Sequence, residues 1–147
     1  MRAHDILDKK GYVLIGVSPQ ATLSDAAAIM RREQVGALVV LGDGGSFRGI
    51  VGERELVNEL AARGAWSADL PVQAVMLTDV PLAAPGDSVA DLMAAMTAHR
   101  MRHIPVISEG MVVGIVSIGD AVKHRLQEKI DENAVLRDMA LAHLIAA

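Results

Sequence analysis

Cysteine is absent from the sequence, so disulfide bonds and thiolate metal sites are excluded. Aromatic residues make up only 2% of the chain, and a stacking platform for single-stranded nucleic acid is therefore hard to build. The formal net charge of -4 supplies no general basic field, although a local basic patch is still compatible with that total. We therefore expect that nucleic acid is not a partner of this protein.

Long hydrophobic runs are missing as well. The longest, such as Ala37 to Leu41, are far shorter than the roughly 20 residues that a membrane helix needs. Met1 to Asp5 lead into charged residues rather than into an apolar export segment. These features predict a cytoplasmic protein without a membrane partner. At 147 residues with 52% hydrophobic residues, the chain is long enough for one compact domain with a sizeable core.

The stretch 112–120 has the pattern of a strand that turns directly into a helix. Val112 to Val116 are mostly β-branched and apolar, as a covered strand requires, and helical spacing resumes at Ala121. Ser117 can cap the new helix, whose first N–H groups suit a phosphate or another anion. Asp120 faces the same opening, and its acceptor-only oxygens suit a pair of ribose hydroxyls. The alternative is that Ser117 and Asp120 merely cap the helix.

The rest of the chain divides into short strands and helices. Thr22 and Asp25 have the spacing of a helix-capping box, and Gly64 is placed to end a later helix. The predicted elements are a short helix or arm over 1–12, a strand over 13–17, a helix from 23 to about 34, strands over 37–41 and 47–51 around a turn at 42–45, a helix over 53–63, and a connector over 66–78.

This pattern occurs twice. A shift of 66 residues carries Pro19 to Pro85 and Thr22 to Ser88, and the apolar stripe of the first helix recurs with them. A shift of 65 carries 49–51 to 114–116, since one residue is missing from the second turn. We therefore predict an α/β fold of two pseudo-symmetric β-α-β-β-α repeats that pack face to face through their sheets.

The last segment, from Ala121 to about Ile145, reads as one long helix without Pro or Gly. At about 1.5 Å per residue it extends well over 30 Å, which is more than a repeat of this size needs to cover its sheet. Its apolar positions are Leu126, Ile130, Val135, Leu136, Met139 and Leu144. We predict that this overhanging helix helps to form a homodimer.

With these motifs in hand, the sequence resembles a tandem pair of CBS domains, a Bateman module. The second copy carries the hallmarks Arg102-His103-Ile104-Pro105-Val106 and Gly114-Ile115-Val116-Ser117 with Asp120, and the first copy carries the weaker Gly49-Ile50-Val51-Gly52 with Glu55. The match covers roughly residues 13–125. The expected division is one module over 1–147, with repeat 1 at 13–65, repeat 2 at 79–125 and a C-terminal helix at 126–147.

The resemblance implies a regulatory sensor that binds AMP, or a related adenine nucleotide such as ADP, ATP or NAD, between the two repeats. It implies no enzymatic activity, so that any output passes through a protein partner. Carried over residue by residue, the better of two clefts is lined by Ser18, Val35, Gly36, Ala37, His103, Ile115, Ser117 and Asp120, with Lys123 one turn further along. In this assignment Ile115 lies against the base, Ser117 and Asp120 hold the sugar and phosphate, and His103 is near the phosphate.

The second cleft departs from the family pattern. Gly52 stands where the serine is expected and Glu55 where the aspartate is expected. Its other lining residues are Gly49, Ile50, Met101, Arg102 and His103. This weaker cleft either binds a nucleotide, binds a different ligand or stays empty.

Two other functions compete with the sensor. A ligand-independent dimerisation or scaffold module with vestigial clefts is favoured by Gly52 and Glu55 and opposed by Ser117 and Asp120. His99 and His103 are spaced as metal ligands on one helix face, but a helix-to-strand crossing is predicted between them, and we expect no metal site. A Ser-His-Asp arrangement, a P-loop and a dinucleotide glycine fingerprint are all missing from the sequence.

Overall fold

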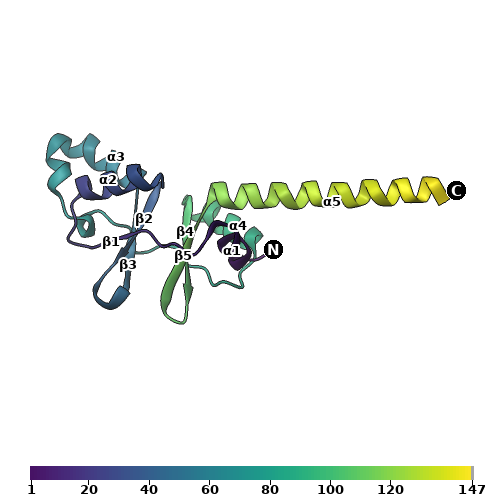
Figure 1. Ribbon diagram of the computed structural model, residues 1–147. Coiled ribbons are helices and arrows are strands. Elements are labelled where there is room, and N and C mark those ends of the chain that lie inside the picture. Colours follow the sequence, from purple (N-terminus) through teal and green to yellow (C-terminus); the bar gives the residue numbers. More distant parts are fainter. Residues whose placement is uncertain (147) are drawn as a thin grey trace.

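Two similar units of strands and helices lie side by side in the computed structural model, which describes residues 1–146 (Figure 1). A long helix, α5, leaves the second unit and extends away from both. Residue 147, the last of the predicted C-terminal helix, lies outside the described part of the chain.

The first unit is a three-stranded sheet covered by two helices. Its elements are β1 (Gly16–Val17), α2 (Leu23–Glu33), β2 (Ala37–Leu41), β3 (Phe47–Gly52) and α3 (Glu53–Arg63). β2 pairs in parallel with β1 and antiparallel with β3. The predicted strand over 13–17 is wrong in length, because only Gly16 and Val17 pair with β2, while the Val13 side chain is 82% exposed. The predicted capping box at α2 is confirmed: Thr22 Oγ1 accepts from the Asp25 amide at 3.1 Å, and Asp25 Oδ2 accepts from the Thr22 amide at 3.0 Å.

The second unit repeats this plan. Its elements are α4 (Val89–His99), β4 (His103–Ser108), β5 (Met111–Ser117) and α5 (Ile118–Ala146). A single parallel bridge between Ala83 and Val106 stands in for its first strand, and the same shift of 66 residues relates it to the pairing of Val17 with Val40. The helices before β2 and β4 both end on a left-handed residue, Gln34 at φ 54° and Arg100 at φ 53°. The predicted duplication is therefore confirmed.

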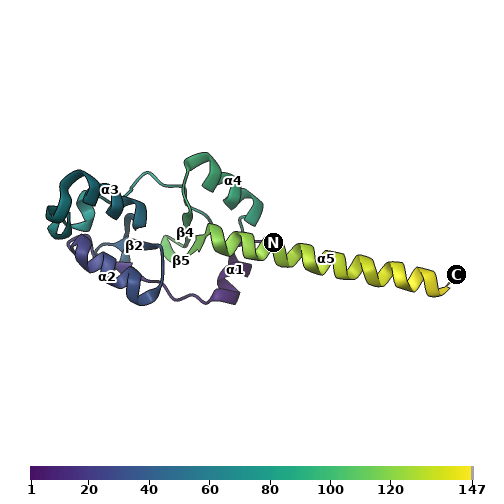
Figure 2. The ribbon, with the colours of Figure 1, turned by 90° about the horizontal axis from the view of Figure 1, so that it is seen from above.

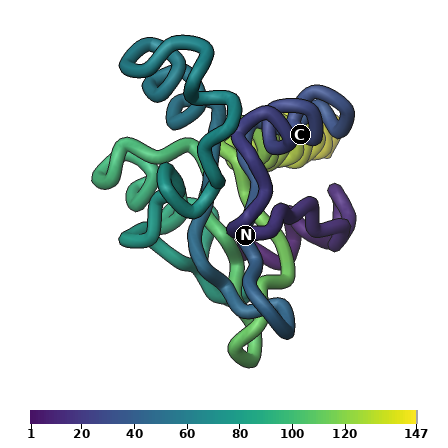
Figure 3. Tube along the Cα trace, turned by 90° about the vertical axis from the view of Figure 1, so that its left-hand side faces the viewer, coloured from purple at the N-terminus to yellow at the C-terminus, as the bar shows by residue number. Residues whose placement is uncertain are grey.

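Each unit has a hydrophobic core of its own, completed by a segment that precedes the other unit in sequence. The N-terminal helix α1 (Ala3–Lys10) buries Ala3, Ile6 and Leu7 in the core of the second unit. The connector, with short 3-10 helices at Gly64–Asp69 and Val72–Ala74, buries Val72 in the core of the first unit. In Figure 3 the purple N-terminal segment lies beside the green β5, with which α1 is in contact. The two segments thus tie the repeats to each other.

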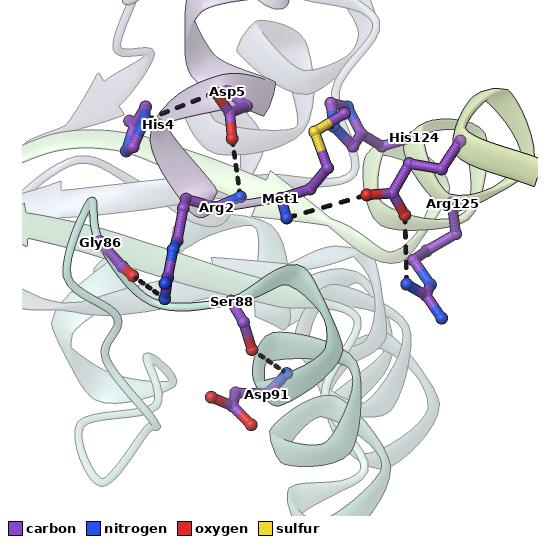
Figure 4. Close-up of polar contacts among 10 residues, drawn as sticks. Met1, Arg2, His4, Asp5, Gly86, Ser88, Asp91, His124 and Arg125 are labelled. Atoms are coloured by element: carbon purple, nitrogen blue, oxygen red, sulfur yellow. Dashed lines mark hydrogen bonds and ion pairs between the residues drawn. The ribbon is translucent and has the colours of Figure 1, made fainter. Parts of the chain in front are cut away.

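Polar contacts hold the N-terminal segment on the second unit (Figure 4). The Arg2 guanidinium donates to the Gly86 carbonyl at 2.9 Å, and the Ala3 amide donates to the Asp87 carbonyl at 2.8 Å. His124 Nε2 lies 3.0 Å from Met1 Sδ, at the base of α5. The start of the chain is therefore part of the folded second repeat.

Helix α5 is continuous over 29 residues, which corresponds to about 43 Å. Ala121 and His124 in its first turns are buried, and its C-terminal part projects beyond α1 and α4 (Figures 1 and 2). The predicted long helix is thus confirmed. No helix within residues 1–146 has the length and apolar content needed to cross a membrane.

Candidate functional site

The corner between β5 and α5 is built by reciprocal capping. Ser117 Oγ accepts from the Asp120 amide at 3.0 Å, and Asp120 Oδ2 accepts from the Ser117 amide at 3.0 Å. Both side chains therefore satisfy amides at the helix start, as the capping alternative requires. A carboxylate oxygen can accept more than one hydrogen bond, so Oδ2 can hold a further donor while it caps the helix.

Lys10, which the sequence analysis did not single out, supplies that donor. Its Nζ donates to Asp120 Oδ2 at 2.7 Å and to the Ile115 carbonyl at 2.9 Å. Burial by itself raises the pKa of Asp120, but hydrogen bonds from Lys10 and Ser117 outweigh it, and the net pKa is lowered. Lys10 and Asp120 are 110 residues apart, so no spacing or motif in the sequence connects them.

A hollow of about 180 Å³ lies beside this ion pair, between α1 and the first turns of α5. We call it the Asp120 hollow, and its lining residues are Ile6, Lys9, Lys10, Asp120, Lys123, His124 and Gln127. Of the residues predicted for the better cleft, it contains Asp120 and Lys123. Ser117 contacts Asp120 directly through the capping hydrogen bonds, and the Ile115 carbonyl is linked to Asp120 by the Lys10 ammonium. Three lysines against one carboxylate make this hollow attractive to an anion.

The first repeat forms the corresponding corner with different chemistry. Glu55 Oε2 accepts from the Gly52 amide at 2.8 Å, which reproduces half of the Ser117–Asp120 arrangement, while the missing side chain of Gly52 removes the other half. A cleft of about 110 Å³ opens here. We call it the Glu55 cleft, and it is lined by Gly36, Ala37, Ile50, Gly52, Glu53, Arg54, Glu55, Leu77, Arg100, Met101, Arg102 and His103.

The Glu55 cleft combines residues from both predicted sets. Ile50, Glu55 and the stretch 101–103 were predicted for the weaker cleft, whereas Gly36 and Ala37 were predicted for the better one. The structure therefore brings the starts of β2 and β4 to one site, at the boundary between the repeats.

Two arginines of the Glu55 cleft, Arg54 and Arg100, were missed in the sequence, whereas Arg102 was predicted there. Arg54 and Arg100 join Arg102 there, and an Arg54 guanidinium N–H donates to the Arg100 carbonyl at 3.1 Å. The repeat shift places these positions over Gly119, Gln34 and Gly36, so none of the three pseudo-symmetric positions carries a cation. A comparison of the charges at aligned positions of the two repeats is the sequence signal that would reveal these arginines.

His103 lies at the boundary between the two repeats. A Cβ atom placed on Gly36 would be 3.2 Å from His103 Cε1, so glycine allows the ring to pack against the start of β2. Burial lowers the pKa of His103, while the carboxylates of Glu53 and Asp120 act in the opposite direction. The imidazole is therefore neutral at pH 7.

The remaining predicted residues lie outside both linings. Ser18 is exposed directly after β1, and Val35 packs on the core of the first repeat. Gly49 is buried in β3, where a Cβ atom would be 2.6 Å from the Leu77 carbonyl oxygen, so it permits close approach of the connector. His99 ends α4 and His103 begins β4, so the two histidines do not share a helix. No group of three potential metal-ligating side chains occurs within the described chain.

A family model described as CBS domain matches residues 5–62 and 72–127. The chain belongs to the CBS domain family. The crystal structure of a CBS-domain containing protein from Agrobacterium tumefaciens is 37% identical with a TM-score of 0.83, and the match covers 85% of this chain and 99% of that one. Hypoxic response protein 1 from Mycobacterium tuberculosis is 31% identical over 147 residues, covering 95% of this chain and 97% of the relative.

A more distant CBS domain protein, from Pyrobaculum aerophilum, is known in complex with AMP. It is 23% identical with a TM-score of 0.73, and the match covers 82% of this chain and 89% of that one, a likeness that shows the shared fold. Tandem CBS proteins are commonly regulatory, and proteins made of CBS domains alone are typically not catalysts.

Proposed function

We propose that this CBS pair is a regulatory sensor that binds an adenine nucleotide of the AMP, ADP, ATP or NAD type and acts through a partner protein. The observation that carries the proposal is the Ser117–Asp120 corner beside the Asp120 hollow. It offers a hydroxyl, a carboxylate and the edge of β5 at one place. These groups match the hydroxyls of a ribose and the polar edge of a base.

Cations near each corner complement the phosphate of such a ligand. Lys123 lines the Asp120 hollow, and Arg54, Arg100 and Arg102 line the Glu55 cleft. Arginine and lysine are the residues that bind phosphate most strongly, arginine through its planar fork. The Pyrobaculum protein supports the choice of an adenine nucleotide, since the same fold holds AMP there.

Isothermal titration calorimetry with AMP, ADP, ATP and NAD tests the proposal. Asp120→Asn keeps the shape of the side chain but removes the charge, and hydrogen bonds to charged groups contribute about 1.5–3 kcal/mol. We expect this variant to bind roughly ten- to a hundredfold more weakly. Asp131→Asn, at an exposed position on α5, is the matched control and should bind like the parent protein. Absence of heat with all four nucleotides at high micromolar protein would contradict the proposal.

A ligand-independent scaffold is the second candidate. It is favoured by Gly52, which lacks the expected hydroxyl, and by Glu55, whose carboxylate already caps α3. The same calorimetric series separates the two, because a scaffold with vestigial clefts binds none of the four nucleotides.

We further propose that the chain forms a homodimer through α5. Large apolar side chains on the projecting part are open to solvent: Leu136 is 61% exposed, Met139 64% and Leu144 71%. An unpartnered helix with apolar residues on several faces is stabilised by a second helix. Sedimentation equilibrium of Leu136→Glu should show a weakened or absent dimer, whereas Lys129→Gln on the same helix should behave like the parent protein. A parent protein that is monomeric at 100 micromolar, on the order of the weakest specific dimers, would contradict this proposal.

A further inference from the structure

The Lys10 ammonium contacts two of the acceptors that a ligand of the Asp120 hollow would use. It lies 2.7 Å from Asp120 Oδ2 and 2.9 Å from the Ile115 carbonyl oxygen. Both contacts come from α1, a segment that precedes the first repeat, and they reach across to the corner of the second. An ammonium held between a carboxylate and a carbonyl makes the hydrogen bonds that the hydroxyl and amino groups of a ligand could donate there.

The first repeat closes the equivalent strand edge in a different way. Ile50, the counterpart of Ile115, exchanges two backbone hydrogen bonds with Leu77: its amide donates at 2.9 Å and its carbonyl accepts at 2.8 Å. Backbone pairing of this kind is released only if the connector itself moves. In the second repeat the Ile115 carbonyl is bonded by a side chain instead, and a lysine side chain changes rotamer without any movement of the backbone.

The size of the Asp120 hollow makes such a movement necessary. It encloses about 180 Å³, whereas pockets that hold small organic ligands measure about 300–1,000 Å³. The Lys10 side chain is 35% exposed, so it has a path into solvent. α1 remains anchored when Lys10 leaves, because Ala3 and Leu7 are fully buried in the core of the second repeat.

We propose that Lys10 is an internal competitor for the Asp120 hollow: its ammonium and the sugar of a bound nucleotide use Asp120 in mutually exclusive ways. The inference rests on the proposed function, since it concerns the same site. A bound nucleotide replaces the contact between α1 and the β5–α5 corner. The contacts of α1 therefore depend on whether a nucleotide occupies the Asp120 hollow.

Binding of AMP and of adenosine to the parent protein, Lys10→Met and Lys129→Met tests the inference. Loss of a partly exposed ion pair that competes with the ligand should lower the Kd of Lys10→Met by about three- to tenfold for both ligands. Lys129→Met removes the same charge from a position far along α5, outside the lining of the hollow, so its Kd should stay within about twofold of the parent value.

Three results overturn the inference, and they can be told apart. An unchanged Kd for Lys10→Met leaves the nucleotide site standing and removes Lys10 from it. A higher Kd for AMP with an unchanged Kd for adenosine makes Lys10 a phosphate contact instead of a competitor. If neither the parent protein nor Lys10→Met binds either ligand, the proposed function fails together with the inference.

Lysine reactivity gives a second readout on the unmodified chain. Reductive methylation followed by mass spectrometry should find Lys10 slow to react in the free protein and several-fold faster with saturating AMP. Lys129, which pairs with Glu132 far along α5, is the internal control and should not change. Slower methylation of Lys10 in the presence of AMP would overturn the inference, since it would mean that the ammonium contacts the bound ligand.

Discussion

Leu7 and Gly114 provide a direct test of the packing of α1 on the second repeat. Leu7 is fully buried, and a Cβ atom on Gly114 would lie 2.7 Å from Leu7 Cδ2 and 3.1 Å from Cδ1. Carbon atoms in good contact are about 3.5–4.0 Å apart, so the added methyl group of Gly114→Ala forces Leu7 to withdraw by roughly 1 Å. Overpacking of this kind costs about 1–3 kcal/mol.

The double variant decides whether the two residues interact. Leu7→Ala alone should lower the free energy of unfolding by about 2–5 kcal/mol, since it leaves a cavity. In the Leu7→Ala, Gly114→Ala protein the new methyl group enters that cavity without a clash. We therefore expect the combined loss to be smaller than the sum of the single losses by about 1–2 kcal/mol.

Urea unfolding of the four proteins, followed by circular dichroism, measures these differences if the m value stays constant. Gly86→Ala is the control, because a Cβ atom there meets nothing within 4 Å, and its effect should remain within about 0.5 kcal/mol. Additive losses in the cycle would refute the packing of α1 against β5.

Two further predictions concern His103 and the helix caps. Because burial lowers the pKa of His103, the unfolded chain takes up this proton first, and the free energy of unfolding should fall as pH drops below about 6.5. Urea unfolding at pH 5.5 and 7.5 should show a smaller pH dependence for His103→Gln, and an equal dependence would contradict the assignment. Thr22→Ala and Ser88→Ala each remove a cap hydrogen bond, of 3.1 Å and 3.0 Å, and should each cost about 1 kcal/mol. Ser24→Ala, at an exposed position within α2, should change stability little; equal losses for all three variants would argue against capping.

Local patterns predicted most of the fold. The box of Thr22 and Asp25 depends on near neighbours in the chain, the recurrence at 65–66 residues repeats such local patterns, and the structure confirms both. The first strand was predicted too long because apolar residues at 13–15 suggested pairing, although only Gly16 and Val17 are in register with β2. A run of apolar residues shows that a segment can pair, but the pairing itself needs a partner from elsewhere.

The candidate site was predicted in part for a similar reason. Ser117, Asp120 and Glu55 belong to motifs within one corner, and each corner forms as a local unit. The two hollows, in contrast, are assembled from several elements. Arg100 of the Glu55 cleft and Lys9 and Lys10 of the Asp120 hollow come from segments that carry no motif of their own.

What the amino-acid order alone determined is the duplicated unit of strands, helices and caps, because hydrogen bonds between near neighbours and side-chain periodicity act within a few residues. Only the tertiary structure decided that α1 completes the second repeat, that the connector completes the first, and that Lys10 meets Asp120. These contacts join segments up to 110 residues apart, and they follow from which buried surfaces fit together once both sheets have formed.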